Sequence, residues 1–168
     1  MSTKRWTILE VLDWTRGHFE AKGIGSARLD AEIIIAHALN LQRVMLYARF
    51  DQPLKPDELT AIREMVARRA KHEPMAHLLG KREFWSLDLE VTADTLIPRP
   101  DTETLVELAL EKMAADAGFV DVGTGSGCIA LALASERKEA PGYATDVSEA
   151  ALTVARRNAE SLELNEDF

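Results

Sequence analysis

The stretch of residues 119–134, FVDVGTGSGCIALALA, constrains the fold of this chain more than any other. An apolar run that stops at glycines and continues as an Ala- and Leu-rich run predicts a buried strand, a tight turn and a helix. Because Gly123, Gly125 and Gly127 lack a Cβ atom, the backbone can approach a bound molecule closely, and the first N–H groups of the helix point toward it. We therefore expect this loop to bind a ligand.

The spacing of the glycines argues against a phosphate ligand. The dinucleotide fingerprint G-x-G-x-x-G/A has Cys128 at its third position here, and no Gly-Lys-Ser/Thr sequence ends a phosphate-binding loop. Asp121 places a carboxylate at the end of the strand, where it would repel a pyrophosphate but suit an amino group. The loop therefore favours a cationic ligand.

A second short strand is predicted over residues 142–146 and ends in Asp146. An acid at the tip of the second strand of a βαβ unit, about 20 residues after the glycine loop, can accept hydrogen bonds from a ribose diol. The pattern D-x-G-x-G-x-G followed by this acid resembles the nucleoside half of class I S-adenosylmethionine-dependent methyltransferases. In that resemblance Asp146 faces the ribose and Asp121 the methionine end. The alternative is a turn whose glycines serve only tight packing.

The two halves of the chain differ in charge. Residues 1–80 carry twelve Lys/Arg and ten Asp/Glu, whereas residues 81–168 carry eight and eighteen, which together give the net charge of −8. This split indicates two domains. The acidic second half is a poor surface for a phosphate backbone, so nucleic acid is a disfavoured substrate. No apolar run is long enough to predict a membrane helix, and we expect a cytoplasmic protein.

Apolar spacing in the first eighty residues predicts a small helical bundle without catalytic groups. Ser26 is expected to cap the second helix, and Leu29 to belong to its buried face. The scattered histidines do not predict a metal site, and Cys128, the only cysteine, reads most simply as a small buried residue. The predicted helices cover residues 7–21, 27–39, 42–48 and 56–70.

The segment between the halves contains two further features. Alternation over residues 83–92 predicts a half-exposed strand, or two strands joined by a turn at about residues 85–88. Pro98 and Pro100 restrict the backbone on both sides of Arg99, and Asp101 is expected to cap a helix that runs to about residue 115. Arg99 would then either pair with a carboxylate near a ligand cleft or tie the two domains together.

Four motifs together resemble a known family. They are GKREFW at 80–85, LIPRPDTET at 96–104, DVGTGSG at 121–127 and ATDVSEAAL at 144–152, in this order after a helical domain. The chain thereby resembles the HemK/PrmC release-factor glutamine methyltransferases over nearly its whole length. The IPRPDTE segment joined to the helical domain is the most specific of these features, because the glycine loop marks only the large methyltransferase superfamily.

The resemblance implies transfer of a methyl group from S-adenosyl-L-methionine to the side-chain amide of the glutamine in the Gly-Gly-Gln loop of peptide chain release factors. The release factor is the implied partner, contacted through the helical domain and the catalytic face. The implied fold is α/β, with an amino-terminal helical bundle over residues 1–80, a β-hairpin linker over 81–98, and over 99–168 the first half of a Rossmann-like class I methyltransferase sheet. The implied cofactor contacts are Gly123, Thr124, Gly125, Ser126, Gly127, Asp146, Asp121 and Arg99.

One family motif is not found in these 168 residues. The family holds the substrate amide with an Asn-Pro-Pro-Tyr segment, so no catalytic residue is assigned here, and we expect the chain to be the amino-terminal portion of an enzyme. The chain alone is then expected to transfer no methyl group and to bind the cofactor weakly at best, and turnover with radiolabelled cofactor would contradict this. Half a sheet also leaves apolar surface uncovered, which predicts self-association detectable by light scattering.

Two other functions remain open at this point. A nucleic-acid adenine N6-methyltransferase shares the glycine loop and the Asn-Pro-Pro-Tyr chemistry, but the acidic second half and the helical first half speak against it. A non-catalytic interaction module would dock a partner through the helical domain. A melting shift with S-adenosylhomocysteine favours a cofactor pocket, whereas a shift with release factor alone favours the docking module.

Overall fold

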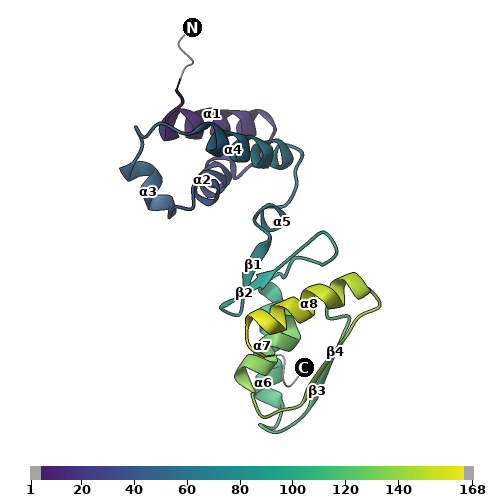
Figure 1. The fold of residues 1–168 in the computed structure, drawn as a ribbon. Coiled ribbons are helices and arrows are strands. Elements are labelled where there is room, and N and C mark those ends of the chain that lie inside the picture. The colour runs from purple at the N-terminus through teal and green to yellow at the C-terminus, as the bar shows by residue number, and fades with distance from the viewer. Residues whose placement is uncertain (1–4, 165–168) are drawn as a thin grey trace. The chain divides into compact units, whose positions relative to one another are not determined.

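The structure is a computed structural model that describes residues 5–164. Its contacts divide the chain into two units, residues 1–79 and residues 80–168. Helices come first in the chain, and two small sheets with further helices follow, so the predicted α/β class is confirmed (Figure 1). Within residues 5–164, every helix is too short or too polar to cross a membrane.

The first unit is built from helices that pack α1 on α2 and α2 on α4 (Figure 1). The helices are α1 (Ile8–Ala21), α2 (Ala27–Ala38), α3 (Arg43–Ala48), α4 (Pro56–Arg69) and α5 (Met75–Leu79). The four predicted helices are thus confirmed to within a residue at each end, whereas α5 was not predicted. Phe19, Ile34 and Leu46 are among the fully buried residues of the core.

Of two sequence predictions for α2, one is confirmed in position only and the other is wrong. Ser26 is the N-cap residue, but its side chain forms no capping hydrogen bond. Leu29 is 43% exposed, because Ala27, Ala31 and Ile34 define the buried face and Leu29 lies off it at helical spacing. The buried face also contains a carboxylate, that of Asp30, whose Oδ2 lies 2.7 Å from Arg69 Nε.

The second unit begins with an antiparallel hairpin of β1 (Lys81–Phe84) and β2 (Leu87–Glu90). Trp85 and Ser86 form the turn, with φ of 53° and 59°. Positive φ at both central positions gives the backbone twist that a two-residue hairpin needs. The prediction of one strand over residues 83–92 is therefore wrong, and the alternative of two strands is confirmed.

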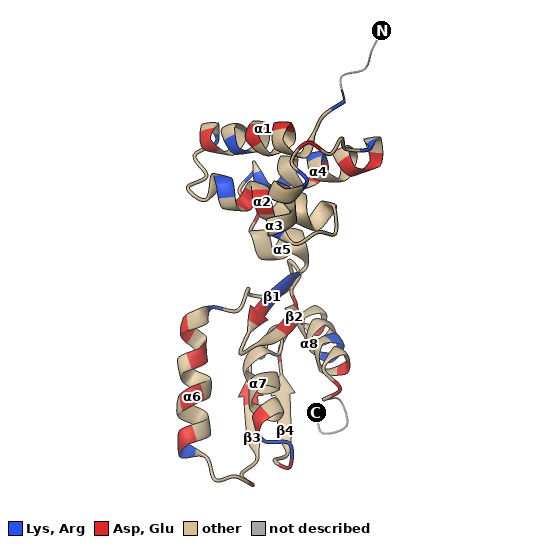
Figure 2. Cartoon of the chain, turned by 90° about the vertical axis from the view of Figure 1, so that its left-hand side faces the viewer, with Lys and Arg blue, Asp and Glu red and all other residues tan. Residues whose placement is uncertain are grey.

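The segment after the hairpin starts a helix without the predicted cap. The 3₁₀ turn η1 (Pro100–Thr102) runs into α6 (Glu103–Lys112), so Asp101 lies inside the turn and its side chain caps nothing. The helix also ends earlier than residue 115. The first residue of α6, Glu103, contacts the hairpin turn. One of its carboxylate oxygens accepts a hydrogen bond of 3.0 Å from the backbone N–H of Trp85. Figure 2 shows acidic residues spaced along α6.

The predicted strand-turn-helix unit is present, and its strands are parallel. The elements are β3 (Phe119–Val122), α7 (Cys128–Glu136), β4 (Gly142–Thr145) and α8 (Glu149–Ser161), with Phe119 opposite Gly142 in the register. Helix α7 packs on both strands and on α8, and its Leu131 is fully buried. Val120, Val122 and Tyr143 are exposed on these strands, although parallel sheets are normally covered on both faces. We call these three residues the open sheet face; self-association through it stays a prediction.

Candidate functional site

The glycine loop leaves β3 and enters α7 through three left-handed residues. The φ angles of Gly123, Gly125 and Gly127 are 81°, 57° and 82°. Residues other than glycine rarely adopt such left-handed φ values. A Cβ atom on Gly127 would lie 3.0 Å from Leu131 Cδ1 and 3.2 Å from Ala155 Cβ, so this glycine is needed for packing. A Cβ atom on Gly123 or Gly125 would meet nothing within 4 Å. These two glycines therefore face open space that a ligand can enter.

Asp146, at the end of β4, lies against this loop. Its Oδ2 accepts a hydrogen bond of 2.9 Å from the Gly125 N–H, and its Oδ1 accepts one of 2.9 Å from the Ser148 N–H. The N–H of Ser148, followed by that of Gly125, holds the pKa of the Asp146 carboxyl below its ordinary value. Each carboxylate oxygen retains a further lone pair. The side chain can therefore accept additional hydrogen bonds, such as those of a vicinal diol.

Asp121 and Thr124 form a second polar pair at the same loop. The Thr124 hydroxyl donates a hydrogen bond of 2.7 Å to Asp121 Oδ2, and Thr124 is buried while Asp121 is half-buried. The other oxygen of Asp121 has no hydrogen bond within residues 5–164. A half-buried carboxylate with one unpaired oxygen is suited to an ammonium group.

Arg99 is the predicted site residue whose side chain forms no hydrogen bond with the loop. Its side chain is exposed and forms neither a hydrogen bond nor an ion pair with any described residue. Only its backbone carbonyl is engaged, with the Thr102 N–H at 3.0 Å. The role of Arg99 in ligand binding stays a proposal.

Asn158 on α8 is a site residue that sequence reasoning missed. It is 1% exposed, and its Nδ2 donates to the carbonyls of Ser126 at 2.8 Å and Glu90 at 3.0 Å. Its Oδ1 accepts from the Glu90 N–H at 2.6 Å. One amide thus ties the buried Ser126 of the loop to strand β2. The available signal was an asparagine among Val154, Ala155 and Ala159 on the buried face of an amphipathic helix.

Comparison with known proteins decides the family. The model of the PrmC N-terminal domain matches residues 10–80, and that of the methyltransferase small domain matches residues 100–168. The chain is also 51% identical over 155 residues to the release factor glutamine methyltransferase of Geobacter sulfurreducens, covering 92% of this chain and 55% of the relative. This chain belongs to the PrmC family. The resemblance stated from its motifs is confirmed.

Other relatives of this PrmC-family chain match over similar lengths. The release factor glutamine methyltransferase of Rhodopirellula baltica is 41% identical over 167 residues, covering 96% of this chain and 56% of the relative. The release factor glutamine methyltransferase of Nitratidesulfovibrio vulgaris is 44% identical over 159 residues, covering 94% of this chain and 54% of the relative. The chain therefore spans about half the length of the curated relatives it matches. The methyltransferase small domain confirms that the second unit contains the start of a class I methyltransferase fold.

The cysteine of the PrmC-family chain is not suited to act as a nucleophile. Cys128 begins α7 and is half-buried, and burial raises the pKa of its thiol above the ordinary value. A thiol with a raised pKa is a poor nucleophile at neutral pH. Within residues 5–164, no three His, Cys, Asp or Glu side chains come close enough together to hold a metal ion.

Replacing Asn158 by alanine is expected to lower the free energy of unfolding of the PrmC-family chain by roughly 2–4 kcal/mol. The substitution leaves the Ser126 carbonyl and both backbone groups of Glu90 without their partner. Urea denaturation measures the loss. The control is Arg157→Ala, which removes the neighbouring exposed ion pair with Glu90 and should cost less than about 1 kcal/mol. Equal losses in the two variants would contradict the role given to Asn158.

The stability contributed by Asp146 is expected to disappear in acid. Because its pKa is lowered in the folded chain, the carboxylate stabilises the fold above its ordinary pKa of about 4 and ceases to do so as the pH falls through the lower folded value. Denaturation of the chain and of Asp146→Asn, compared between pH 3 and pH 7, measures this. The difference in free energy of unfolding between the chain and the variant should be constant above about pH 5 and become smaller below about pH 4. A difference that does not change with pH would contradict the stabilising role given to the Asp146 carboxylate.

Proposed function

We propose that this chain binds S-adenosyl-L-methionine for methylation of the glutamine side-chain amide in the Gly-Gly-Gln loop of peptide chain release factors. The observation that carries the proposal is the Asp146 carboxylate hydrogen-bonded to Gly125, beside glycines that face open space. The relatives named release factor glutamine methyltransferases support the substrate. In this proposal the chain has three parts, which are a helical docking domain over residues 1–80, a hairpin linker over residues 81–98 and a cofactor domain over residues 99–168.

The proposed contacts follow from the chemistry of each group. Asp146 would accept hydrogen bonds from the ribose hydroxyls, and the backbone of residues 123–127 would lie along the nucleoside. Asp121 would pair with the amino group of the methionine part through its unpaired oxygen. Arg99 is proposed to pair with a carboxylate, since its guanidinium has no partner within the described residues.

The residues of this chain account for cofactor binding and not for activation of the amide. An amide nitrogen is a poor nucleophile because its lone pair is delocalised, so the NH₂ group must be held in line with the sulfonium methyl and its hydrogens accepted. The cofactor supplies an electrophilic methyl group. We therefore assign the chain a donor-binding role, and assign amide positioning to the Asn-Pro-Pro-Tyr segment of the family, which is not among these 168 residues.

Cofactor binding is tested directly with the 168-residue chain. A saturating concentration of S-adenosylhomocysteine should raise its melting temperature, because a ligand that binds only the folded state stabilises it by mass action. Adenine alone, which lacks the ribose and the amino acid, should not. The interaction-module alternative predicts no shift with S-adenosylhomocysteine and a shift with release factor, and that pattern would overturn the proposal.

Methyl transfer is tested in a hybrid. The chain replaces the corresponding part of the Geobacter sulfurreducens relative, with which it shares 51% identity. The hybrid, once shown to melt cooperatively, should transfer the labelled methyl group of S-adenosylmethionine to a release factor, and should not label one whose Gly-Gly-Gln glutamine is replaced by alanine. Labelling of both factors, or of DNA instead, would overturn the substrate assignment.

A further inference from the structure

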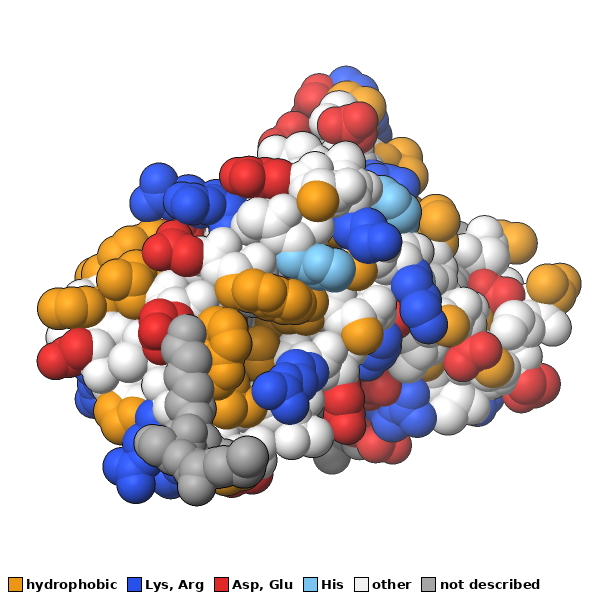
Figure 3. Space-filling model, turned by 90° about the horizontal axis from the view of Figure 1, so that it is seen from above, with side chains coloured by type: hydrophobic (Ala, Val, Ile, Leu, Met, Phe, Trp, Pro, Cys, Tyr) orange, Lys and Arg blue, Asp and Glu red, His pale blue; other side chains and the backbone are white. Residues whose placement is uncertain are grey.

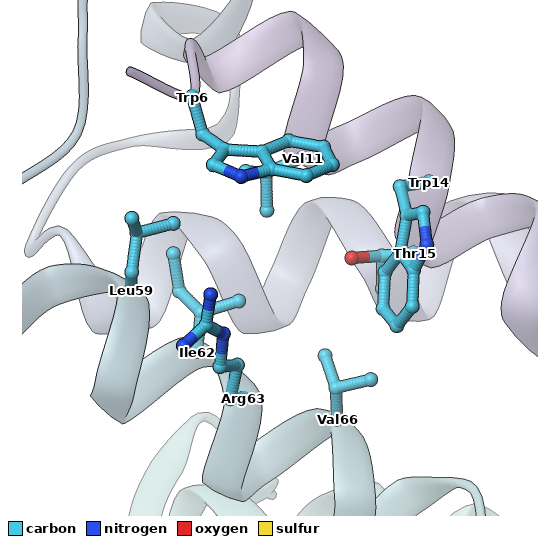
Figure 4. A pocket seen from close by; sticks show the side chains of 8 residues that line it. All are labelled: Trp6, Val11, Trp14, Thr15, Leu59, Ile62, Arg63 and Val66. Carbon is cyan, nitrogen blue, oxygen red and sulfur yellow. The ribbon is translucent and has the colours of Figure 1, made fainter. Parts of the chain in front are cut away.

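A hollow lies between α1 and α4 in the first unit and is not used by the proposed reaction. Its volume is about 220 Å³. Figure 4 shows side chains from both helices converging on it. The lining residues are Trp6, Val11, Trp14, Thr15, Leu59, Ile62, Arg63 and Val66. Pockets for drug-sized molecules are typically about 300–1,000 Å³. The hollow is thus of a size for a bulky side chain.

The walls of the hollow suit an apolar side chain. Val11, Ile62 and Val66 are buried and form its floor, while Trp14 is exposed and stacks on His18 with ring centroids 5.0 Å apart. Exposed aromatic side chains at a concave surface are common binding anchors. The exposed ring of Trp14 is therefore accessible to a bound segment.

One polar group on the inner wall has no partner. Thr15 is fully buried, and its hydroxyl forms no hydrogen bond with any described residue. Figure 4 shows this oxygen directed into the space between the two helices. A buried hydroxyl without a partner costs free energy. A donor or acceptor on a bound segment would satisfy it.

A second hollow continues from the first toward the start of α4 and gives the site a charge. The two share Trp6, Leu59 and Arg63, and the second adds Arg5 and Lys55. None of these three cations forms an ion pair within residues 5–164, and no acidic residue is among the described residues that line either hollow. Figure 3, which shows the molecule from above, has hydrophobic side chains on this face with both Lys/Arg and Asp/Glu side chains among them. The charged side chains among the described lining residues are therefore all cationic.

We propose that these two hollows form one groove, the α1/α4 groove, that binds a protein segment carrying a bulky apolar side chain next to acidic residues. The apolar side chain enters the hollow between α1 and α4, and the neighbouring carboxylates pair with Arg63, Lys55 and Arg5. A nucleic acid is disfavoured as the occupant, because only three cations among residues 5–164 line a groove whose depth is apolar. The inference does not depend on cofactor binding by the second unit.

The test uses short synthetic peptides and the fluorescence of Trp6 and Trp14. Trp85 of the second unit is replaced by phenylalanine, so that the signal comes from the groove. Three peptides are titrated: a phenylalanine flanked by glutamates, the same peptide with lysine flanks, and the glutamate peptide with serine for phenylalanine. The first should give a saturable change and bind at least about 10-fold more tightly than the other two. Its affinity should fall as salt is added.

Variants separate binding from folding. Arg63→Glu should lower the affinity for the acidic peptide by roughly 10-fold. Lys22→Glu reverses an exposed charge that does not line the groove and should leave this affinity unchanged. Thr15→Val should raise the melting temperature and yet weaken peptide binding, which a purely structural residue would not do. Equal binding of the three peptides, no saturation by the acidic one, or no effect of Arg63→Glu would overturn the inference.

Discussion

Replacing Asp146 by asparagine is expected to weaken S-adenosylhomocysteine binding by roughly 100-fold. The two carboxylate oxygens serve two backbone donors, the N–H groups of Gly125 and Ser148. An asparagine has one acceptor oxygen, so its NH₂ group would face one of these donors. The loop would then lose its support and the ribose its charged acceptor. Isothermal titration of the 168-residue chain measures the loss.

A second ligand locates the effect within the cofactor. 5′-Methylthioadenosine keeps the nucleoside of S-adenosylhomocysteine and lacks the amino-acid part. Asp146→Asn should lower the affinity for both ligands. Asp121→Asn should lower the affinity for S-adenosylhomocysteine and leave that for 5′-methylthioadenosine nearly unchanged. The control is Asp116→Asn, an exposed acid of the same unit. If Asp146→Asn and Asp116→Asn bind S-adenosylhomocysteine equally well, the proposed ribose contact is absent.

Replacing Gly142 by valine is expected to destabilise the second unit by roughly 3 kcal/mol or more. Gly142 is buried at the start of β4, and a Cβ atom there would lie 2.5 Å from Cζ and 2.9 Å from Cε1 of Phe119. The ring stands opposite it in the parallel register, so it must leave its place on the sheet. Urea denaturation of the variant measures the effect, and Gly25→Val, at a position with open space within 4 Å, is the control.

The contact with Phe119 can be tested as the cause of this loss. Phe119→Ala removes the ring, so in its presence Gly142→Val should cost far less, and the double-mutant cycle should give a large coupling energy. A cost that is the same with and without the ring would show that another contact is responsible.

Local patterns predicted the elements of this chain well. The apolar spacing that marks α1, α2 and α4 depends on the nearest turns of one helix, so their bounds followed from the sequence to within a residue. The strand, loop and helix around Gly125 were equally visible, because glycines interrupt an apolar run there. The hairpin was harder to place, since its turn uses Trp85 and Ser86 at positive φ in place of the usual Asn and Gly.

Contacts between distant residues were out of reach of the sequence. Arg69, at the end of α4, pairs with the buried Asp30, which lies 39 residues away in the sequence. Asn158 bonds to Ser126 and Glu90 across two elements. Such partners are chosen by the packing of whole elements, which no local period encodes. In the candidate site, the position of Asp146 after its strand was predicted, whereas the amide that supports the loop was not.

The open sheet face has a consequence during protein synthesis. Relatives such as that of Geobacter sulfurreducens are nearly twice as long as the part this chain matches, so in them the corresponding half leaves the ribosome first. A nascent chain folded to this stage presents Val120, Val122 and Tyr143 to the surrounding solution, and Val122 is 81% exposed. Exposed apolar surface of this kind makes a partly folded chain prone to aggregation. We therefore expect these three residues to be a point of aggregation in an incompletely synthesised chain.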